Sequence, residues 1–110
     1  MKLTELYPQF LAREDDSQSK TVDTLAEADG IMFLCPKCFV ANGGPMGTHV
    51  IICWKPSVPL TASPSPGRWN MRGTGYGDLS LDAGSSSIQL TGGCRWHGFV
   101  KDGKITDASG

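Results

Sequence analysis

The sequence predicts a small, mainly β domain with antiparallel strands. Glycine and proline are frequent, at 14 and 7 of 110 residues, which is typical of a chain with many turns. Short apolar or β-branched runs recur from residue 31 onward, and turn residues bound each run. The chain carries four cysteines and its first residues do not have the composition of a signal peptide. These cysteines are therefore expected to be metal ligands or buried thiols rather than disulfides.

The N-terminal segment, residues 1–30, is predicted to be helical and polar, and to pack on or lead into the domain. Apolar residues in 3–13 recur at near-helical spacing, and Pro8 limits this stretch to a short or broken helix. Residues 21–30 predict a second helix of one or two turns, which ends at a glycine. One or two short N-terminal helices are therefore expected.

Residues 31–110 are predicted to form a metal-binding β domain. The segment 97–108 reads as a hairpin, and Asp102 and Gly103 in its turn are residues that tolerate positive φ angles. Residues 56–67 hold most of the prolines and are expected to be a loop. Further strands are expected at 31–34, 48–55, 68–73, 79–81 and 87–90.

Two short pieces of similar form predict a metal site. They are "CPKC" at 35–38 and "CRWH" at 94–97, and each has two sulfur or nitrogen donors separated by two residues. This spacing lets a tight turn direct both donors at one ion, and structural zinc takes four such ligands in a tetrahedron. The predicted ligands are Cys35, Cys38, Cys94 and His97.

Two other interpretations of the cysteines remain open. Cys35, Cys38, His49 and Cys53 have a compact zinc-finger spacing. That set requires His49 and Cys53 to converge, whereas residues four apart along a strand lie roughly 13 Å from one another. If residues 48–55 form a strand, as expected, the compact set cannot form. Cys53 is then a core thiol, and His49 is a structural histidine at the start of the strand. Alternatively, the four cysteines bind no metal and pack in a small core.

Part of the chain resembles known metal-binding families. "CRWHGFVKDGKI" resembles the second half of a Rieske box, which implies a [2Fe–2S] cluster as the alternative to Zn²⁺, although the first pair here is C-x-x-C where the Rieske box has C-x-H. Over residues 31–108, "CPKC", "DLSLDAGSSSI" and "CRWHGFVKDGKI" are similar to a family of small phage and prophage proteins. This resemblance implies a metal-binding β domain of viral origin, with zinc-ribbon-like or Rieske-like hairpins.

The predicted ligand set favours a non-enzymatic role. Four ligands, three of them thiolates, close the zinc site, and no H-x-E motif stands beside either pair, so no catalytic residue is assigned. We expect a zinc-stabilised protein-interaction module, a phage accessory factor that acts on a host protein. A Rieske-like electron-transfer protein is the alternative.

A surface for a protein partner is predicted around the glycine-rich stretch "GTGYG". Tryptophan, tyrosine and arginine often anchor protein interfaces, and they also stack on single-stranded bases. A single-stranded nucleic-acid binder is therefore a second alternative, but the net charge of −1 argues against it. Nothing in the sequence indicates a membrane span, and a cytoplasmic location is expected, in the host if the chain is viral. The predicted partner-binding residues are Arg68, Trp69, Arg72, Tyr76, Arg95 and Trp96.

Overall fold

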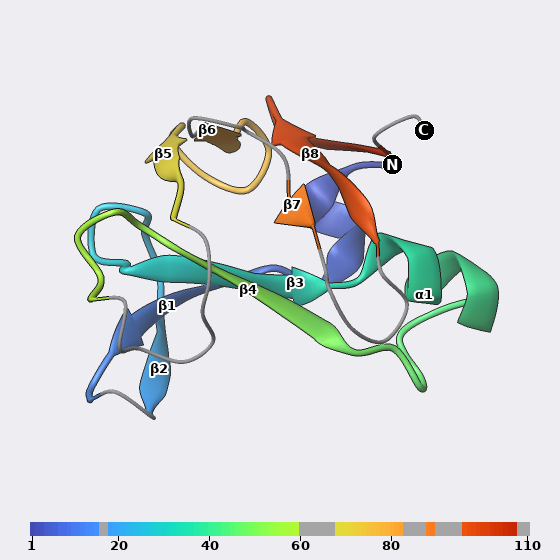
Figure 1. The fold of residues 1–110 in the computed structure, drawn as a ribbon, viewed down its shortest axis with the longest axis horizontal. Helices are drawn as coiled ribbons and strands as arrows, with labels where there is room; N and C mark the ends of the chain where they lie inside the picture. The colour runs from blue at the N-terminus through green and yellow to red at the C-terminus, as the bar shows by residue number, and fades with distance from the viewer. Residues whose placement is uncertain (16–17, 60–67, 83–87, 90–95, 108–110) are drawn as a thin grey trace.

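The fold is mainly β, as predicted. The computed structural model describes residues 1–15, 18–59, 68–82, 88–89 and 96–107. Its elements lie in two layers of antiparallel strands, and one short α-helix projects at one end (Figure 1). In chain order they are η1 (Leu3–Leu6), β1 (Gln9–Arg13), β2 (Ser19–Val22), β3 (Gly30–Leu34), α1 (Pro36–Asn42), β4 (Val50–Trp54), β5 (Asn70–Arg72), β6 (Ser80–Asp82), β7 (Ile88–Gln89), β8 (His97–Lys101) and β9 (Lys104–Asp107).

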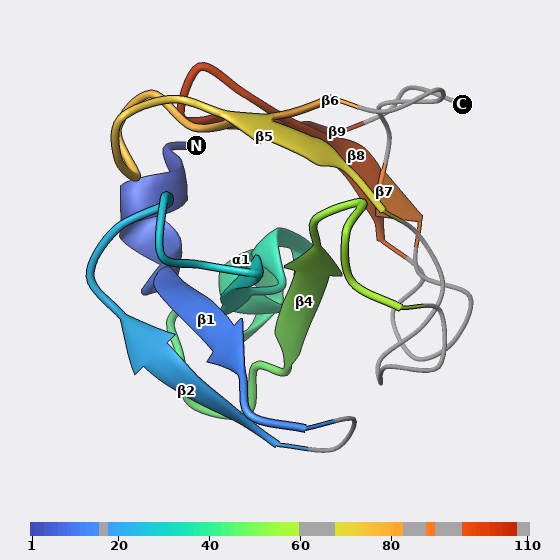
Figure 2. The same cartoon turned by 90° about the vertical axis from the view of Figure 1, so that its left-hand side faces the viewer.

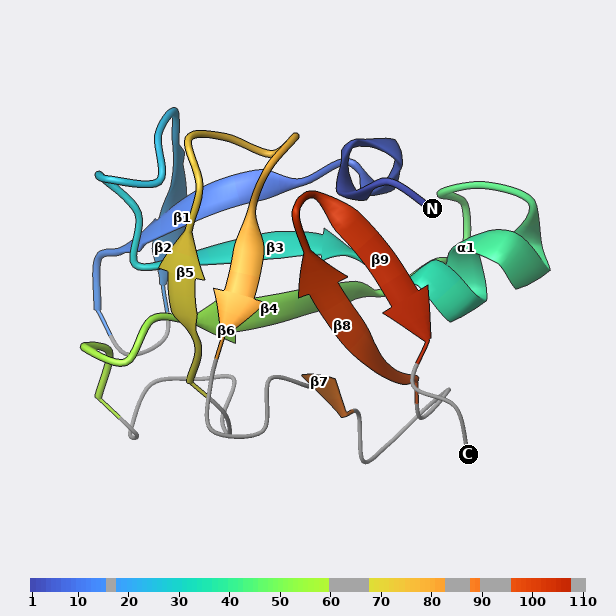
Figure 3. The same cartoon turned by 90° about the horizontal axis from the view of Figure 1, so that it is seen from above.

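The first layer is a four-stranded sheet with the order β2-β1-β3-β4. All neighbours are antiparallel, and the β3–β4 register pairs Ile31 with Cys53 and Leu34 with Val50. The second layer holds the β5–β6 pair and the three-stranded sheet β7-β8-β9. Seen from above, β5, β6, β8 and β9 lie across the first sheet (Figure 3).

Backbone hydrogen bonds join the two layers on both sides. On one side, the N–H of Trp69 donates to the carbonyl oxygen of Trp54 over 3.0 Å. On the other side, the N–H of Leu3 donates to the carbonyl oxygen of Gly103 over 2.8 Å. The N–H of Ile105 donates to the carbonyl oxygen of Met1 over 2.7 Å. The layers therefore curve around a common core, as the view along the strands shows (Figure 2).

Alternating burial along β3 shows how the core is divided. Ile31 and Phe33 belong to the main core between the layers. Met32, between them in sequence, packs instead with Leu11 and Trp54 in a smaller cluster on the opposite face of the sheet. The main core also contains Leu3, Leu6, Phe10, Ile51, Leu79, Leu81, Ile88, Val100 and Ile105.

The N-terminal segment differs from its prediction. Residues 3–6 form a single 3₁₀ turn, and residues 9–13 are strand β1 rather than a continuation of a helix. The turn buries Leu3 and Leu6, and the strand then places Phe10 in the core. β1 pairs directly with β3, so the segment is part of the first sheet. The apolar residues of this segment have a near-helical spacing because a 3₁₀ turn and the strand after it both direct side chains into the same core.

The second expected helix is also replaced. Residues 19–22 form β2, and only a hydrogen-bonded turn follows, in which the N–H of Glu27 donates to Thr24 Oγ1 over 3.3 Å. The C-terminal hairpin, in contrast, forms as predicted. Asp102 and Gly103 join β8 to β9 at φ angles of 50° and 74°.

Candidate metal centre

The first predicted ligand pair lies where β3 ends and α1 begins. Cys35 is the N-cap residue of α1, and Pro36 fills the first helical position, where its fixed φ suits the helix and no donor is lost. Cys38 follows in the first turn. The helix ends at Gly43, whose φ of 69° allows its N–H to bond back to the oxygens of Phe39 and Val40. The two cysteines of the C-x-x-C pair therefore lie at the N-terminus of a helix rather than in an isolated turn.

The antiparallel sheet brings a histidine to the same place. Because Leu34 pairs with Val50, the next residue outward on each strand is Cys35 on one side and His49 on the other. The N–H of Cys35 donates to the carbonyl oxygen of His49 over 2.9 Å, which extends the β3–β4 pairing by one step. The start of α1 and the start of β4 are therefore held side by side.

Cys35, Cys38 and His49 together can hold a metal ion. Their candidate ligand atoms all lie within 4.8 Å of one another. Cys35 is fully buried, Cys38 is half-buried and the His49 side chain is exposed, so the group extends from the core to the surface. Two thiols and an imidazole are donors typical of zinc and other thiophilic cations.

The structure brings together part of the predicted ligand set. Cys35 and Cys38 lie together, and Cys94 lies outside the described residues. His97 is described but is not a member of the group; it begins β8, pairs with Gln89, and its ring lies 6.5 Å from that of Phe99. The compact set groups Cys35, Cys38 and His49, and the structure brings these three together. The preferred set does not include His49, because the strand register that carries His49 to Cys35 is not visible in the spacing of the residues.

Cys53 belongs to the core rather than to the candidate metal centre. It lies on β4 opposite Ile31 and is fully buried. Burial in apolar surroundings raises the pKa of its thiol far above the ordinary value, so the group stays neutral. No disulfide joins it to Cys35 or Cys38. The compact zinc-finger set therefore loses its fourth ligand, for the reason that strand geometry predicts.

The two tryptophans of the predicted partner surface are buried. Trp96 is 3% exposed, and its indole N–H donates to Asp107 Oδ1 over 2.7 Å. Trp69 is 8% exposed. An aromatic anchor for a partner must reach solvent, so these two residues are not available for that role.

The other predicted surface residues have separate positions. Arg68 is half-buried, and its guanidinium donates to the carbonyl oxygens of Val58 and Pro59. Tyr76 stacks on Phe10 with ring centroids 4.4 Å apart, and its hydroxyl oxygen accepts from the Phe10 N–H. Arg72 is exposed and paired with an aspartate, while Arg95 lies outside the described residues.

Comparisons with known proteins identify no relative of this chain. No protein-family model, curated protein or solved structure matches the chain. Within the part of the chain that the structure describes, no helix has the length and apolar character needed to cross a bilayer. The support for a function therefore comes from the geometry of this chain.

Proposed function

We propose that the chain is a non-enzymatic protein-interaction module, stabilised by one zinc ion at Cys35, Cys38 and His49. The observation that carries the metal part is the convergence of these three donors within 4.8 Å. They come from the end of β3, the first turn of α1 and the start of β4. An ion there would fix the corner between strand, helix and strand, and metal affinity would add directly to the free energy of unfolding.

The fourth ligand and the choice of histidine are part of this proposal. Cys94 stays the predicted fourth ligand, because it is the remaining cysteine and stands in the second C-x-x-H pair. His49 and His97 compete for the nitrogen position. Support for His49 comes from its place in the group of donors, whereas support for His97 comes from sequence spacing.

Metal analysis of two matched variants distinguishes the histidines. Zinc per chain is measured by mass spectrometry of elements after purification, for the wild type and for His49→Ala and His97→Ala. We expect about one zinc in the wild type and in His97→Ala, and much less in His49→Ala. The opposite result would restore the sequence-predicted set with His97. A wild type that binds no zinc would overturn the metal part of the proposal.

An absorption spectrum separates zinc from the iron–sulfur alternative. A zinc protein purified without oxygen is colourless, whereas a [2Fe–2S] centre absorbs visible light. The donor group described here contains two cysteines and one histidine close together, which favours a single ion. We expect no visible absorption; two irons and two acid-labile sulfides per chain would support the electron-transfer function instead.

The interaction part of the proposal extends the resemblance to small phage and prophage proteins. Its partner would then be a host protein, and the domain would act as an accessory factor in the host cytoplasm. A metal-fixed corner lowers the ordering cost of binding, since loops held in place before contact lose less freedom. Zinc removal by a chelator should therefore weaken binding to any partner that contacts this corner.

A further inference from the structure

A short loop connects two of the three donors of the candidate metal centre. Residues 43–48 link the end of α1, which carries Cys38, to His49, directly before β4. Three residues of this loop are glycines at positive φ angles. A Cβ at Gly43 or Gly44 would meet no atom of the described residues within 4 Å, so this part of the loop borders open space. Because glycine has many accessible conformations, packing alone holds little of the path from α1 to His49.

Two polar side chains close this loop. The side-chain amide of Asn42 donates to Thr48 Oγ1 over 3.2 Å, and the Thr48 hydroxyl donates to the carbonyl oxygen of Gly44 over 2.8 Å. The N–H of Thr48 donates to the carbonyl oxygen of Pro45 over 3.1 Å. Thr48 is half-buried and bonds both to the last residue of the helix and to two points of the loop. We call this set of hydrogen bonds the Asn42–Thr48 clasp.

The clasp lies next to a metal ligand along the chain. Thr48 directly precedes His49, whose carbonyl oxygen accepts the N–H of Cys35 over 2.9 Å. That hydrogen bond holds the backbone of His49 to the end of β3, and the clasp holds the preceding residue to the end of α1. The His49 side chain is exposed, so its imidazole is not fixed by burial in the core. Its position relative to the two cysteines therefore depends on how the backbone is held.

We propose that Asn42 and Thr48 are positioning residues, which hold His49 within reach of an ion at the candidate metal centre. This inference rests on the metal part of the proposed function. A loop that is already closed loses less freedom when the ion binds, so zinc affinity should be higher with the clasp than without it. Hydrogen-bonded groups behind metal ligands typically contribute about 10- to 100-fold to metal affinity. The clasp acts on the backbone rather than on the imidazole, so we expect an effect at the lower end of this range.

The zinc affinity of matched variants is the test. Dissociation constants for Zn²⁺ are measured at neutral pH by competition with a chromophoric chelator. Thr48→Val keeps the shape of the side chain and removes the hydroxyl, and it should weaken zinc binding about tenfold. Thr48→Ser keeps the hydroxyl and should bind zinc as the wild type does. Asn42→Ala removes one hydrogen bond of the clasp and should weaken binding about threefold.

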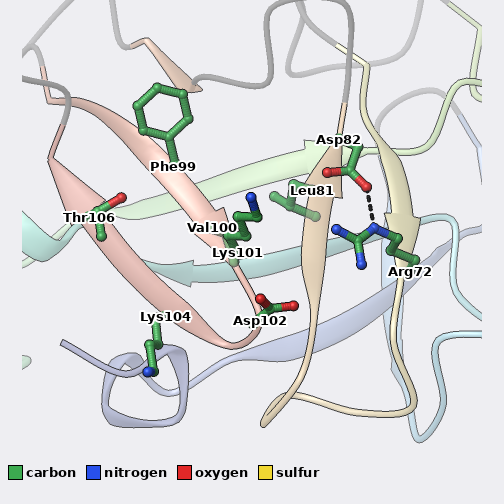
Figure 4. A pocket seen from close by; sticks show the side chains of 9 residues that line it. All are labelled: Arg72, Leu81, Asp82, Phe99, Val100, Lys101, Asp102, Lys104 and Thr106. Carbon is green, nitrogen blue, oxygen red and sulfur yellow. Dashed lines mark hydrogen bonds and ion pairs between the residues drawn. The ribbon is translucent and has the colours of Figure 1, made fainter.

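Two variants elsewhere control for a general loss of stability. Thr24→Val removes a hydroxyl from another exposed turn, where it donates to Glu27 Oε1 over 2.8 Å and accepts from the Glu27 N–H. Arg72→Gln removes the exposed ion pair with Asp82 between β5 and β6 (Figure 4). These two strands lie at the opposite end of the molecule from α1 (Figure 3). Neither variant should change the zinc affinity.

A double-mutant cycle separates positioning from a purely structural contribution. Thr48→Val is combined with His49→Ala, and the zinc affinity is measured again. If the hydroxyl acts through the imidazole, its removal should add no further loss once the imidazole is absent. Urea unfolding gives a second readout. Thr48→Val should cost more stability in the zinc-containing protein than in protein freed of zinc by a chelator, because weaker metal binding lowers the stability of the first form alone.

Equal zinc affinities for Thr48→Val and the wild type would overturn the inference. An equal loss in Thr24→Val, or a loss that persists in full beside His49→Ala, would also overturn it. A wild type that binds no zinc, or whose zinc affinity is unchanged by His49→Ala, contradicts the proposed zinc site and this inference with it. Zinc binding that His49→Ala weakens and Thr48→Val does not contradicts this inference alone, so the two failures are distinguishable.

Discussion

The N–H of Cys35 donates to the carbonyl oxygen of His49, and this one hydrogen bond of 2.9 Å links the two segments of the candidate metal centre. It is the last step of the β3–β4 pairing before the chain leaves the sheet into α1. The strand register therefore determines where the histidine lies, and the helix N-terminus determines where the cysteines lie. Metal binding and the pairing of β3 with β4 should accordingly stabilise each other.

Replacement of one cysteine ligand should remove metal and stability together. We expect Cys35→Ser and Cys94→Ser to lose most of the bound zinc. The free energy of unfolding should fall by roughly 3–4 kcal/mol, as for the loss of cross-links that close loops of about 15 to 60 residues. Zinc analysis and urea unfolding measure the two effects. A folded Cys94→Ser protein that keeps one zinc would remove Cys94 from the ligand set.

Cys53→Ala should leave the metal in place. The thiol is fully buried on β4, so its truncation leaves a small cavity and costs about 1 kcal/mol. Loss of zinc in this variant would instead support the compact set with Cys53.

The same variant should change the stability at high pH. Burial raises the pKa of the Cys53 thiol in the folded protein, so above about pH 8.5 the unfolded chain loses a proton that the folded chain keeps. The unfolded state then binds fewer protons, and the free energy of unfolding falls as the pH rises. Removal of the thiol should reduce this decline between pH 8 and 10, as measured by urea unfolding. An unchanged slope would show that Cys53 is not the titrating group.

Gly98→Ala should destabilise the β8–β9 hairpin. A Cβ at Gly98 would lie 2.3 Å from the ring of Trp96 and 2.4 Å from the carbonyl oxygen of Thr106, and neither the buried indole nor the backbone can easily move. We expect a cost of about 1–3 kcal/mol in urea unfolding. Gly75→Ala is the matched control, since nothing lies within 4 Å of the added atom. Equal costs for the two variants would contradict this account.

Sequence patterns predicted the elements whose information is local. The Asp102–Gly103 turn required two residues that accept positive φ, and the sequence contains a suitable pair between two apolar runs. The need for glycine at position 98, in contrast, is not local: its lack of a side chain makes room for the ring of Trp96 and the backbone of Thr106. The reason lies in Trp96, which directly precedes β8 and is buried against it.

The missed features depend on contacts between distant segments. α1 was not predicted, because the C-x-x-C spacing suits a tight turn as well as a helix N-terminus. The compact spacing included His49 as an alternative, but His49 lies beside Cys35 because of the register of β3 with β4, which the spacing does not determine. The pairing of Arg72 with Asp82 across β5 and β6 was missed for the same reason.

Asp78→Asn should destabilise the protein at neutral pH and much less in acid. The Asp78 carboxylate accepts hydrogen bonds from the N–H of Thr74, the N–H of Gly75 and the Thr74 hydroxyl. These bonds, led by that from the Thr74 N–H, lower the pKa of Asp78 in the folded protein. The stabilisation is therefore fully present above the unfolded-state value, about 3.9, and is lost as the pH falls through the lower folded value.

Urea unfolding of the wild type and of Asp78→Asn at pH 7 and at pH 2.5 measures this effect. The gap between the two midpoints should narrow in acid, because the stabilisation by the wild-type carboxylate declines as the pH falls below the unfolded-state value and towards the lower folded value. Asp23→Asn, at an exposed position outside this turn, should show little gap at either pH. A gap for Asp78→Asn that stays constant between the two pH values would mean that the amide disturbs the turn by its shape, and that the charge of Asp78 does not stabilise it.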